Sequence, residues 1–200
     1  MSEPLLTTRD LTTAVGGPFE LDVFAGQCLT IMGPSGVGKS LLLRALADLD
    51  PHGGEVWLQG ARQSQTPPAL WRRRVLYVPA AAGWWADTVS EHVAEIGKHI
   101  NDLRALGLPL DCGDWPVTRL SSGEKQRLAL LRAVTLTPQV LLLDEPTANL
   151  DADSGLAIEA WLAACKNRGT ALVWVTHDAV QAERVADVRW GLDAHGLKRI

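Results

Sequence analysis

Short apolar runs alternate with longer amphipathic stretches along most of the chain. Three runs, Leu29–Met32, Val140–Leu143 and Ala171–Val175, are apolar and bounded by polar residues, as strands buried on both faces of a parallel sheet tend to be. Two further strands and one helix are predicted at Glu55–Leu58, Val75–Val78 and Leu41–Leu49. The alternation predicts an α/β fold with a mainly parallel central sheet.

Residues 80–118 break this alternation. Helical patterns at Val89–Ile96 and Ile100–Leu106 are interrupted by glycine and proline residues at positions 107, 109, 113 and 116. We interpret residues 80–118 as a short helical insert between two strands of the main sheet, inside one domain that spans residues 1–200. Nearer the N-terminus, Gly16-Gly17-Pro18 is typical of a hairpin turn between two edge strands, which predicts a small antiparallel β subdomain.

Composition and charge narrow the class of protein. Of the 200 residues, 46% are hydrophobic and 21% are charged, which is ordinary for a globular protein. The net charge of -4 gives no electrostatic footprint for nucleic acid, and the basic run Arg72–Arg74 is interpreted as a solvated face. Three scattered cysteines predict neither a disulfide framework nor a zinc site, and they fit a reducing cytosol.

The sequence shows no pattern for insertion into a membrane. Met1–Asp10 carries no basic stretch followed by an apolar one, so no signal peptide is expected. No apolar run approaches the ~18 residues that a spanning helix needs. If the protein works at a membrane, we expect another chain to supply the spanning part.

A glycine-rich loop follows the first predicted strand. Its residues are Gly33, Pro34, Ser35, Gly36, Val37, Gly38, Lys39 and Ser40, which match G-x-x-x-x-G-K-[ST] between a strand and an amphipathic helix. Glycines let backbone N–H groups turn toward phosphate oxygens, and the helix N-terminus adds its partial positive charge. We expect Lys39 to reach the β- and γ-phosphates of ATP and Ser40 to offer its hydroxyl to Mg²⁺.

Two carboxylates end the apolar strand Val140–Leu143. Asp144 is predicted to hold Mg²⁺ or its water shell, and Glu145 to polarise the attacking water as a general base. Taken alone, such a pair is more often a pair of solvated loop acids. A phosphate loop upstream in the same chain favours the catalytic interpretation.

Three further segments give the sequence a family resemblance. Leu120–Arg127 reads Leu-Ser-Ser-Gly-Glu-Lys-Gln-Arg and resembles the signature of ATP-binding cassette (ABC) ATPases. Ala148-Asn149-Leu150-Asp151 resembles the D-loop of that family, and Thr176-His177-Asp178 resembles its switch-histidine region. All occur in the family's order, and the resemblance covers nearly the whole chain. Each piece also has a structural reading: Ser121 and Glu124 form a capping box, Asp151 is a helix cap, and His177 is a loop histidine.

The resemblance implies a mechanism. Two cassettes sandwich two ATP molecules head to tail, so that the phosphate loop of one subunit and Ser121, Ser122, Gly123 and Glu124 of the other hold each nucleotide. Glu145 activates water, His177 contacts the γ-phosphate, and Asp151 communicates across the dimer. Closure and reopening drive a separate transmembrane permease, which holds the cassette on the cytoplasmic, inner face of the plasma membrane.

The sequence departs from the family at three positions. The family has a glutamine after the strand that corresponds to Val75–Val78, and Ala80 stands there. Where the family stacks an aromatic residue on adenine, Leu11–Val15 has none, so we expect adenine to rest on an aliphatic surface or on Phe19. Ser122 replaces a glycine of the signature, which is a small change.

The paired tryptophans Trp84 and Trp85 follow the altered segment at Ala80. In the family this region docks against the membrane partner, so exposed aromatics there are interpreted as an anchor for the permease. The alternative is that both tryptophans pack inside the helical insert.

The type of transporter is less strongly indicated. Asp87-Thr88-Val89, Ser122–Arg127 and Val173–Asp178 are similar to the compact bacterial exporter ATPases of the iron-efflux type. The direction of transport and the substrate stay open, because substrate identity resides in the partner chain. Two alternatives are a soluble ABC ATPase of DNA repair or translation and a regulatory cassette that binds ATP with little turnover.

Overall fold

The computed structural model describes residues 3–148 and 150–200 and contains two sheets. The six-stranded sheet has the order β10-β9-β3-β8-β7-β6, and β9, β3, β8, β7 and β6 run parallel. Its strands are β3 (Cys28–Met32), β6 (Val75–Val78), β7 (Val140–Asp144), β8 (Ala171–Val175), β9 (Val188–Asp193) and β10 (Gly196–Arg199). The predicted strands of this sheet are confirmed to within one residue at each end.

A smaller antiparallel sheet lies beside the main one, in the order β2-β1-β4-β5. Its strands are β1 (Leu6–Thr13), β2 (Gly16–Val23), β4 (Gly53–Leu58) and β5 (Ala61–Arg62). The predicted hairpin exists, but the turn lies at Ala14-Val15, so placing it at Gly16–Pro18 was wrong. Gly17 instead allows a close approach inside the hairpin, because a Cβ there would lie 2.6 Å from the Leu11 carbonyl oxygen. Strand β1 is also not an edge strand, since it pairs with both β2 and β4.

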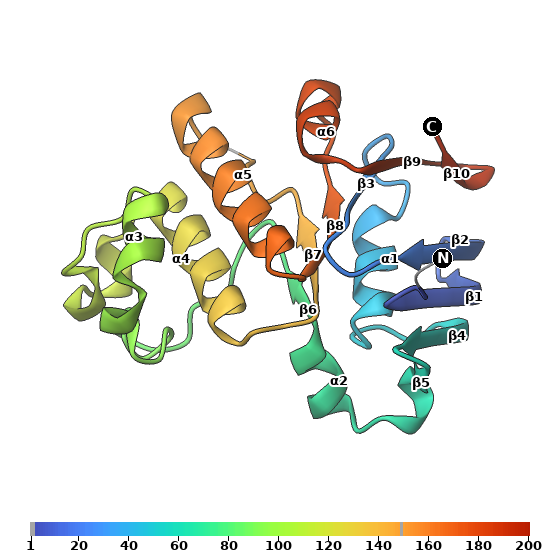
Figure 1. The fold of residues 1–200 in the computed structure, drawn as a ribbon, viewed down its shortest axis with the longest axis horizontal. Coiled ribbons are helices and arrows are strands. Elements are labelled where there is room, and N and C mark those ends of the chain that lie inside the picture. The colour runs from blue at the N-terminus through green and yellow to red at the C-terminus, as the bar shows by residue number, and fades with distance from the viewer. Residues whose placement is uncertain (1–2, 149) are drawn as a thin grey trace.

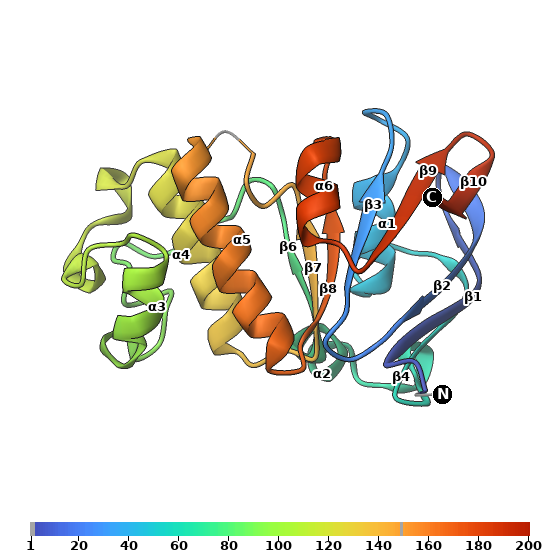
Figure 2. The same ribbon diagram turned by 45° about the horizontal axis from the view of Figure 1, so that its top comes forward.

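Helices cover both faces of the six-stranded sheet (Figures 1 and 2). The six α-helices of the described residues are α1 (Lys39–Leu46), α2 (Pro68–Arg74), α3 (Ile100–Ala105), α4 (Ser122–Thr135), α5 (Ala152–Asn167) and α6 (Ala179–Val185). Helix α1 lies between the two sheets, and α3, α4 and α5 lie on the opposite face of the main sheet (Figure 1). The helix predicted at Leu41–Leu49 therefore begins two residues earlier and ends three residues earlier.

Alternating strand residues divide the interior into two cores. Ile31, Leu142 and Val173 point toward α1 and the small sheet, whereas Leu141, Leu143 and Trp174 point toward α4 and α5. This is the period of two that places successive side chains on opposite faces of a strand. Strands buried on both faces explain why the sequence shows continuous apolar runs there.

Residues 80–118 contain only one α-helix, α3, with short 3₁₀ turns at Ile96–His99, Cys112–Asp114 and Val117–Arg119. The helix predicted at Val89–Ile96 was wrong. The segment makes a single turn, in which Val93 N–H donates to the Val89 carbonyl at 3.0 Å, and Glu95 then has a left-handed backbone (φ 50°) that interrupts a right-handed helix. Val89 and Val93 are fully buried, so their helical spacing reflects the packing of a single turn rather than a whole helix. The boundaries at 80 and 118 stay a prediction.

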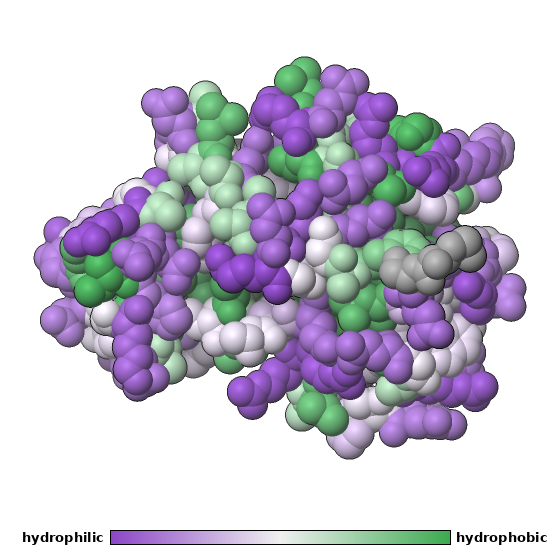
Figure 3. Space-filling view, viewed as in Figure 1, coloured by the Kyte–Doolittle hydropathy of each residue, from purple (hydrophilic) through white to green (hydrophobic). Residues whose placement is uncertain are grey.

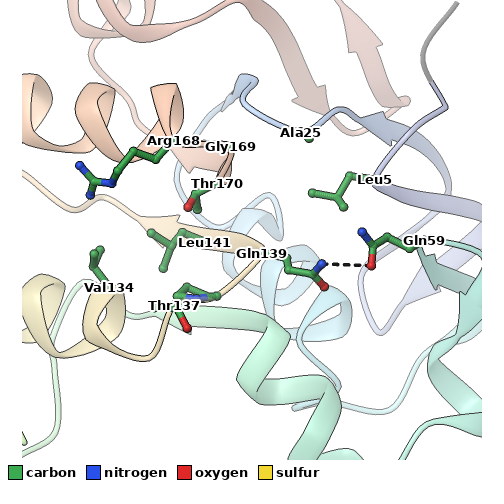
Figure 4. A pocket seen from close by; sticks show the side chains of 11 residues that line it. Leu5, Ala25, Gln59, Val134, Thr137, Gln139, Leu141, Arg168, Gly169 and Thr170 are labelled. Atoms are coloured by element: carbon green, nitrogen blue, oxygen red, sulfur yellow. Dashed lines mark hydrogen bonds between the residues drawn. The ribbon is translucent and has the colours of Figure 1, made fainter.

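The two edges of the parallel sheet differ in character. A hollow of about 420 Å³ opens at the edge where the strands begin, lined by residues that precede β3, β7 and β8 (Figure 4). Gln139 donates to Gln59 at 3.0 Å across this hollow. All the motif residues that follow the parallel strands lie at the other edge, where the strands end, which is the usual ligand edge of an open α/β sheet.

The surface shown in Figure 3 is mostly polar, and apolar residues lie in small separate patches, including patches over α5 and α6. The three cysteines are free and buried. Among the described residues, none of the helices has both the length and the apolar character needed to cross a bilayer.

Candidate nucleotide site

The glycine-rich loop connects β3 to α1 with a backbone that depends on glycine. Gly33, Gly36 and Gly38 all have positive φ angles. A Cβ on Gly33 would lie 2.1 Å from the Leu192 carbonyl oxygen of β9, and a Cβ on Gly38 would lie 2.4 Å from Cγ2 of Val15. The loop therefore sits tightly between β9 and the turn of the small sheet, and side chains at these two positions are excluded by contact as well as by conformation.

The start of α1 is prepared for an anion. Gly38 is the N-cap and offers no side-chain cap, and the first turn of α1 carries no acidic residue. Free N–H groups at a helix start attract phosphate. Lys39 is buried, and its Nζ donates to the carbonyl oxygens of Gly33 and Pro34 at 2.8 and 2.9 Å, which holds the cation inside the loop. Ser40 is exposed at the first turn.

Asp144 is the last residue of β7 and Glu145 follows it, and the two carboxylates have different environments. Asp144 is 6% exposed and accepts a hydrogen bond from the Tyr77 hydroxyl at 2.8 Å. Glu145 has a left-handed backbone (φ 46°), and its N–H donates to the Val175 carbonyl at 3.0 Å. The reversal in backbone direction turns the Glu145 side chain toward the loop after β8. A carboxylate oxygen of Glu145 lies 3.3 Å from Nδ1 of the exposed His177.

Glu145 and His177 share a hollow of about 310 Å³ with Thr147, Thr176 and Gln181. The two predicted catalytic residues come from loops after neighbouring parallel strands, β7 and β8. Parallel pairing brings the ends of those strands to the same edge. The arrangement therefore joins a carboxylate and an imidazole in one polar hollow at the ligand edge of the sheet.

Gln181 is a residue that sequence reasoning missed. It is buried in α6, accepts from the Thr176 hydroxyl at 2.9 Å, and donates to Thr147 at 2.7 Å and to Glu159 at 2.9 Å. These bonds tie the loop after β7 to the loop after β8, so Gln181 fixes the spacing of the segments that carry Glu145 and His177. A buried amide with all these partners rigidifies its surroundings. The signal in the sequence was only a polar residue at a core-facing position of a short helix.

The predicted capping box at the start of α4 is confirmed. The Glu124 N–H donates to the Ser121 hydroxyl at 3.2 Å, and the Ser121 N–H donates to the Glu124 carboxylate at 2.8 Å. Hydrogen bonds from the backbone and the hydroxyl of Ser121 lower the pKa of Glu124. Asp151 caps α5 by accepting from the Ser154 N–H at 2.8 Å, so its structural reading is also confirmed. Asn149 of the D-loop segment lies outside the described residues.

The start of α4 does not meet the phosphate loop of the same chain. Helix α4 packs on one face of the main sheet and α1 on the other (Figure 2). Ser122 instead lines a hollow of about 250 Å³ with Ala80 and Leu150, from the loops after β6 and β7. Gly123 and Glu124 are only partly exposed in the same turn. One chain therefore contains both halves of the motif set without bringing them together.

The adenine expectation is corrected in one part. Phe19 is 3% exposed and belongs to the core between α1 and the small sheet, so it offers no face to a base. Val15 is 55% exposed and touches the phosphate loop at Gly38, which makes it the aliphatic surface nearest to that loop among Leu11–Val15. With Phe19 excluded, an aliphatic surface is the remaining expected contact for adenine.

The two tryptophans after Ala80 differ: one packs inside the protein, and the other is exposed, as a docking residue would be. Trp84 packs against the core that holds α4 and α5, whereas Trp85 is 72% exposed. Arg132 of α4 lies over both rings, at 5.1 and 4.7 Å from their centroids. His92 meets both rings edge to face. Trp85 is therefore largely exposed to solvent while its ring contacts Arg132 and His92.

Known proteins were compared with this chain. Residues 17–148 match the family model described as ABC transporter. The chain belongs to the ABC transporter family. It is 38% identical to a probable sulfate/thiosulfate import ATP-binding protein from Chlorella vulgaris, over 83% of this chain and 75% of the relative. It is also 38% identical to a cobalt import ATP-binding protein from Rhodobacter capsulatus, over 94% of this chain and 76% of the relative.

A solved structure supports the fold. An ATP-binding cassette bound to ADP and Pi, solved in a dimeric post-hydrolysis state, superposes with a TM-score of 0.84 at 23% identity, over 97% of this chain and 98% of the other. Membership of the family makes this chain an ATP-binding, ATP-hydrolysing subunit of a membrane transporter. The α/β fold predicted from the sequence is the ABC ATPase fold.

Proposed function

We propose that two copies of this ABC cassette close head to tail around two ATP molecules. The observation that carries the proposal is the separation of α1 and the start of α4 on opposite faces of one sheet. A second copy can present its Ser121–Glu124 turn to the phosphate loop of the first, which completes a site that one chain leaves open. The N–H groups of Ser121 and Glu124 are engaged in the capping box. The turn therefore offers the N–H groups of Ser122 and Gly123 to the γ-phosphate from the far side.

Each site residue has a role in this proposal. Residues 33–40 cradle the phosphates, and Lys39 leaves its carbonyl partners to bind the β- and γ-phosphates. Glu145 accepts the proton of the attacking water, and His177, beside it, contacts the γ-phosphate. Asp151, at the start of α5, transmits closure to the partner subunit. Val15 supplies an aliphatic surface for adenine.

Mg²⁺ fits the oxygen ligands at this edge of the sheet. Asp144 supplies a carboxylate at the end of β7, and Ser40 supplies a hydroxyl from α1, which packs against β7. Mg²⁺ takes hard oxygen ligands and is commonly held by one or two protein groups together with substrate phosphates. When bound, the ion would neutralise charge that develops on the β- and γ-phosphate oxygens.

We also propose that a separate transmembrane permease holds the cassette on the cytoplasmic face of the plasma membrane and that Trp85 contacts it. Trp85 borders an apolar hollow of about 380 Å³ that Pro79, Ala82 and Leu136 also line. An exposed aromatic beside an apolar hollow is a typical anchor position for a partner side chain. The cage formed by Arg132 and His92 pre-orders the ring, which lowers the entropy lost on docking.

Membrane extraction tests this proposal. Affinity-tagged chain, expressed in its own host and extracted from membranes with mild detergent, is expected to retain a polytopic membrane protein. Trp85→Ala is expected to reduce that recovery about tenfold or more, since aromatic hot spots contribute 2 kcal/mol or more. Leu110→Ala removes another exposed apolar side chain, 49% exposed in a different part of residues 80–118, and serves as the control. Equal recovery of the membrane protein with Trp85→Ala and Leu110→Ala would show that Trp85 is not part of the interface. If the wild-type chain recovers no membrane protein, the proposal of a permease partner is contradicted.

A further inference from the structure

Tyr77 lies on the strand next to the one that ends in Asp144. In the parallel pair β6 and β7, Tyr77 is in register with Leu142, two residues before Asp144. Because side chains alternate along a strand, Leu142 and Asp144 point to the same face, toward α1. Tyr77 packs against the core on that face as well. The register therefore aims the Tyr77 ring along the sheet toward the Asp144 carboxylate.

The contact between them is a well-formed hydrogen bond. The Tyr77 hydroxyl donates to Oδ2 of Asp144 at 2.8 Å. Asp144 is 6% exposed, so water has little access to replace this donor. Among residues 3–148 and 150–200, Asp144 has no other side-chain hydrogen-bond partner.

The segment after Tyr77 supplies no second polar group. Pro79 and Ala80 have no polar side chain, so neither side chain can donate to the carboxylate or bind a metal ion. The orientation of Asp144 about its Cβ–Cγ bond is therefore set by the phenol of Tyr77. Removing a group that orients a metal-ligating side chain typically costs roughly 10- to 100-fold in metal affinity.

We propose that Tyr77 is a positioning residue that holds the Asp144 carboxylate in the orientation that binds the nucleotide's metal ion. The proposal rests on the metal-binding role proposed above for Asp144. It assigns Tyr77 no contact with ATP and no proton transfer. Removing the hydroxyl is expected to weaken binding of the metal ion without weakening binding of the nucleotide.

Metal binding to the nucleotide complex tests this inference. Protein in excess over a non-hydrolysable ATP analogue is titrated with Mn²⁺, and bound Mn²⁺ is followed by electron paramagnetic resonance. Tyr77→Phe keeps the ring and its packing, and it is expected to raise the Mn²⁺ concentration for half-occupancy about tenfold. Binding of the analogue in EDTA is expected to stay within about twofold of wild type, as no phosphate contact changes. Thr66→Val removes a hydroxyl that donates to the Arg62 carbonyl at 2.7 Å and not to Asp144, and it serves as the control.

Asp144→Ala separates the possible outcomes. If Asp144→Ala strongly weakens Mn²⁺ binding and Tyr77→Phe binds Mn²⁺ like wild type, the positioning role is wrong and the metal role of Asp144 stands. If Tyr77→Phe weakens binding of the analogue equally with and without metal, the hydroxyl has a general structural role and the inference is also overturned. If Asp144→Ala leaves Mn²⁺ binding unchanged, the proposed metal role fails, and the inference about Tyr77 fails with it.

Discussion

Replacing Glu145 with Gln is expected to reduce ATP turnover by about 10²- to 10⁴-fold, the usual contribution of a positioned general base. Gln keeps the shape of the side chain but accepts protons far more weakly. The left-handed backbone at Glu145 and the bond from its N–H to Val175 do not depend on the carboxylate, so the loop should keep its conformation. Steady-state phosphate release measures the loss.

The same variant is expected to trap a dimer. With ATP bound and hydrolysis blocked, two chains stay closed, and size-exclusion chromatography in ATP should show twice the mass of the wild-type peak. Glu183→Gln changes an exposed carboxylate on α6 that pairs only with Arg189 among the described residues and is the control. Turnover within a few-fold of wild type for Glu145→Gln would remove Glu145 from the role of base.

Replacing Gly33 with Ala is expected to destabilise the protein by roughly 2–4 kcal/mol, the sum of a strained backbone and an overpacked contact. The added Cβ would lie 2.1 Å from the Leu192 carbonyl oxygen, and that atom belongs to β9, which is paired on both sides. The backbone cannot yield without breaking sheet hydrogen bonds. Urea denaturation measures the change in the free energy of unfolding.

Gly36→Ala separates the cost of backbone strain from the cost of the steric contact with Leu192. Gly36 also has a positive φ, but nothing lies within 4 Å of its added Cβ. It should therefore lose only about 1–2 kcal/mol from the unfavourable conformation. ATP affinity should fall further in Gly33→Ala, because the whole loop is displaced from β9. Equal losses of stability in the two variants would show that the contact with Leu192 carries no energetic weight.

The parallel strands could be predicted because burial on both faces leaves an unbroken apolar run. Val140–Leu143 and Ala171–Val175 are such runs, and each belongs to a strand that is paired on both sides. Val89–Ile96 was misassigned for the opposite reason. Its apolar spacing is that of a helix, but only one turn forms before Glu95, whose backbone is left-handed. The bonds from Val89 and Ser90 N–H to residues 115 and 113 fix this turn against a distant segment, and no local pattern shows such a partner.

The candidate site was predictable where chemistry is local in sequence. The phosphate loop, the acids after β7 and the capping box each lie within a few consecutive residues. Tyr77 and Gln181 were missed because their partners lie 67 and 34 residues away. Phe19 was misjudged because an aromatic residue near the loop says nothing about which face of its strand is buried. Contacts with residues distant in the sequence, rather than local propensities, decide these three positions.

Phosphate release from MgATP by the purified chain, measured across a range of protein concentrations, tests the central claim most directly. The account predicts turnover per chain that rises with protein concentration, because two chains complete each site, and that disappears in Lys39→Ala. ATP binding without phosphate release at any concentration, or turnover that is independent of concentration and survives in Lys39→Ala, would contradict it.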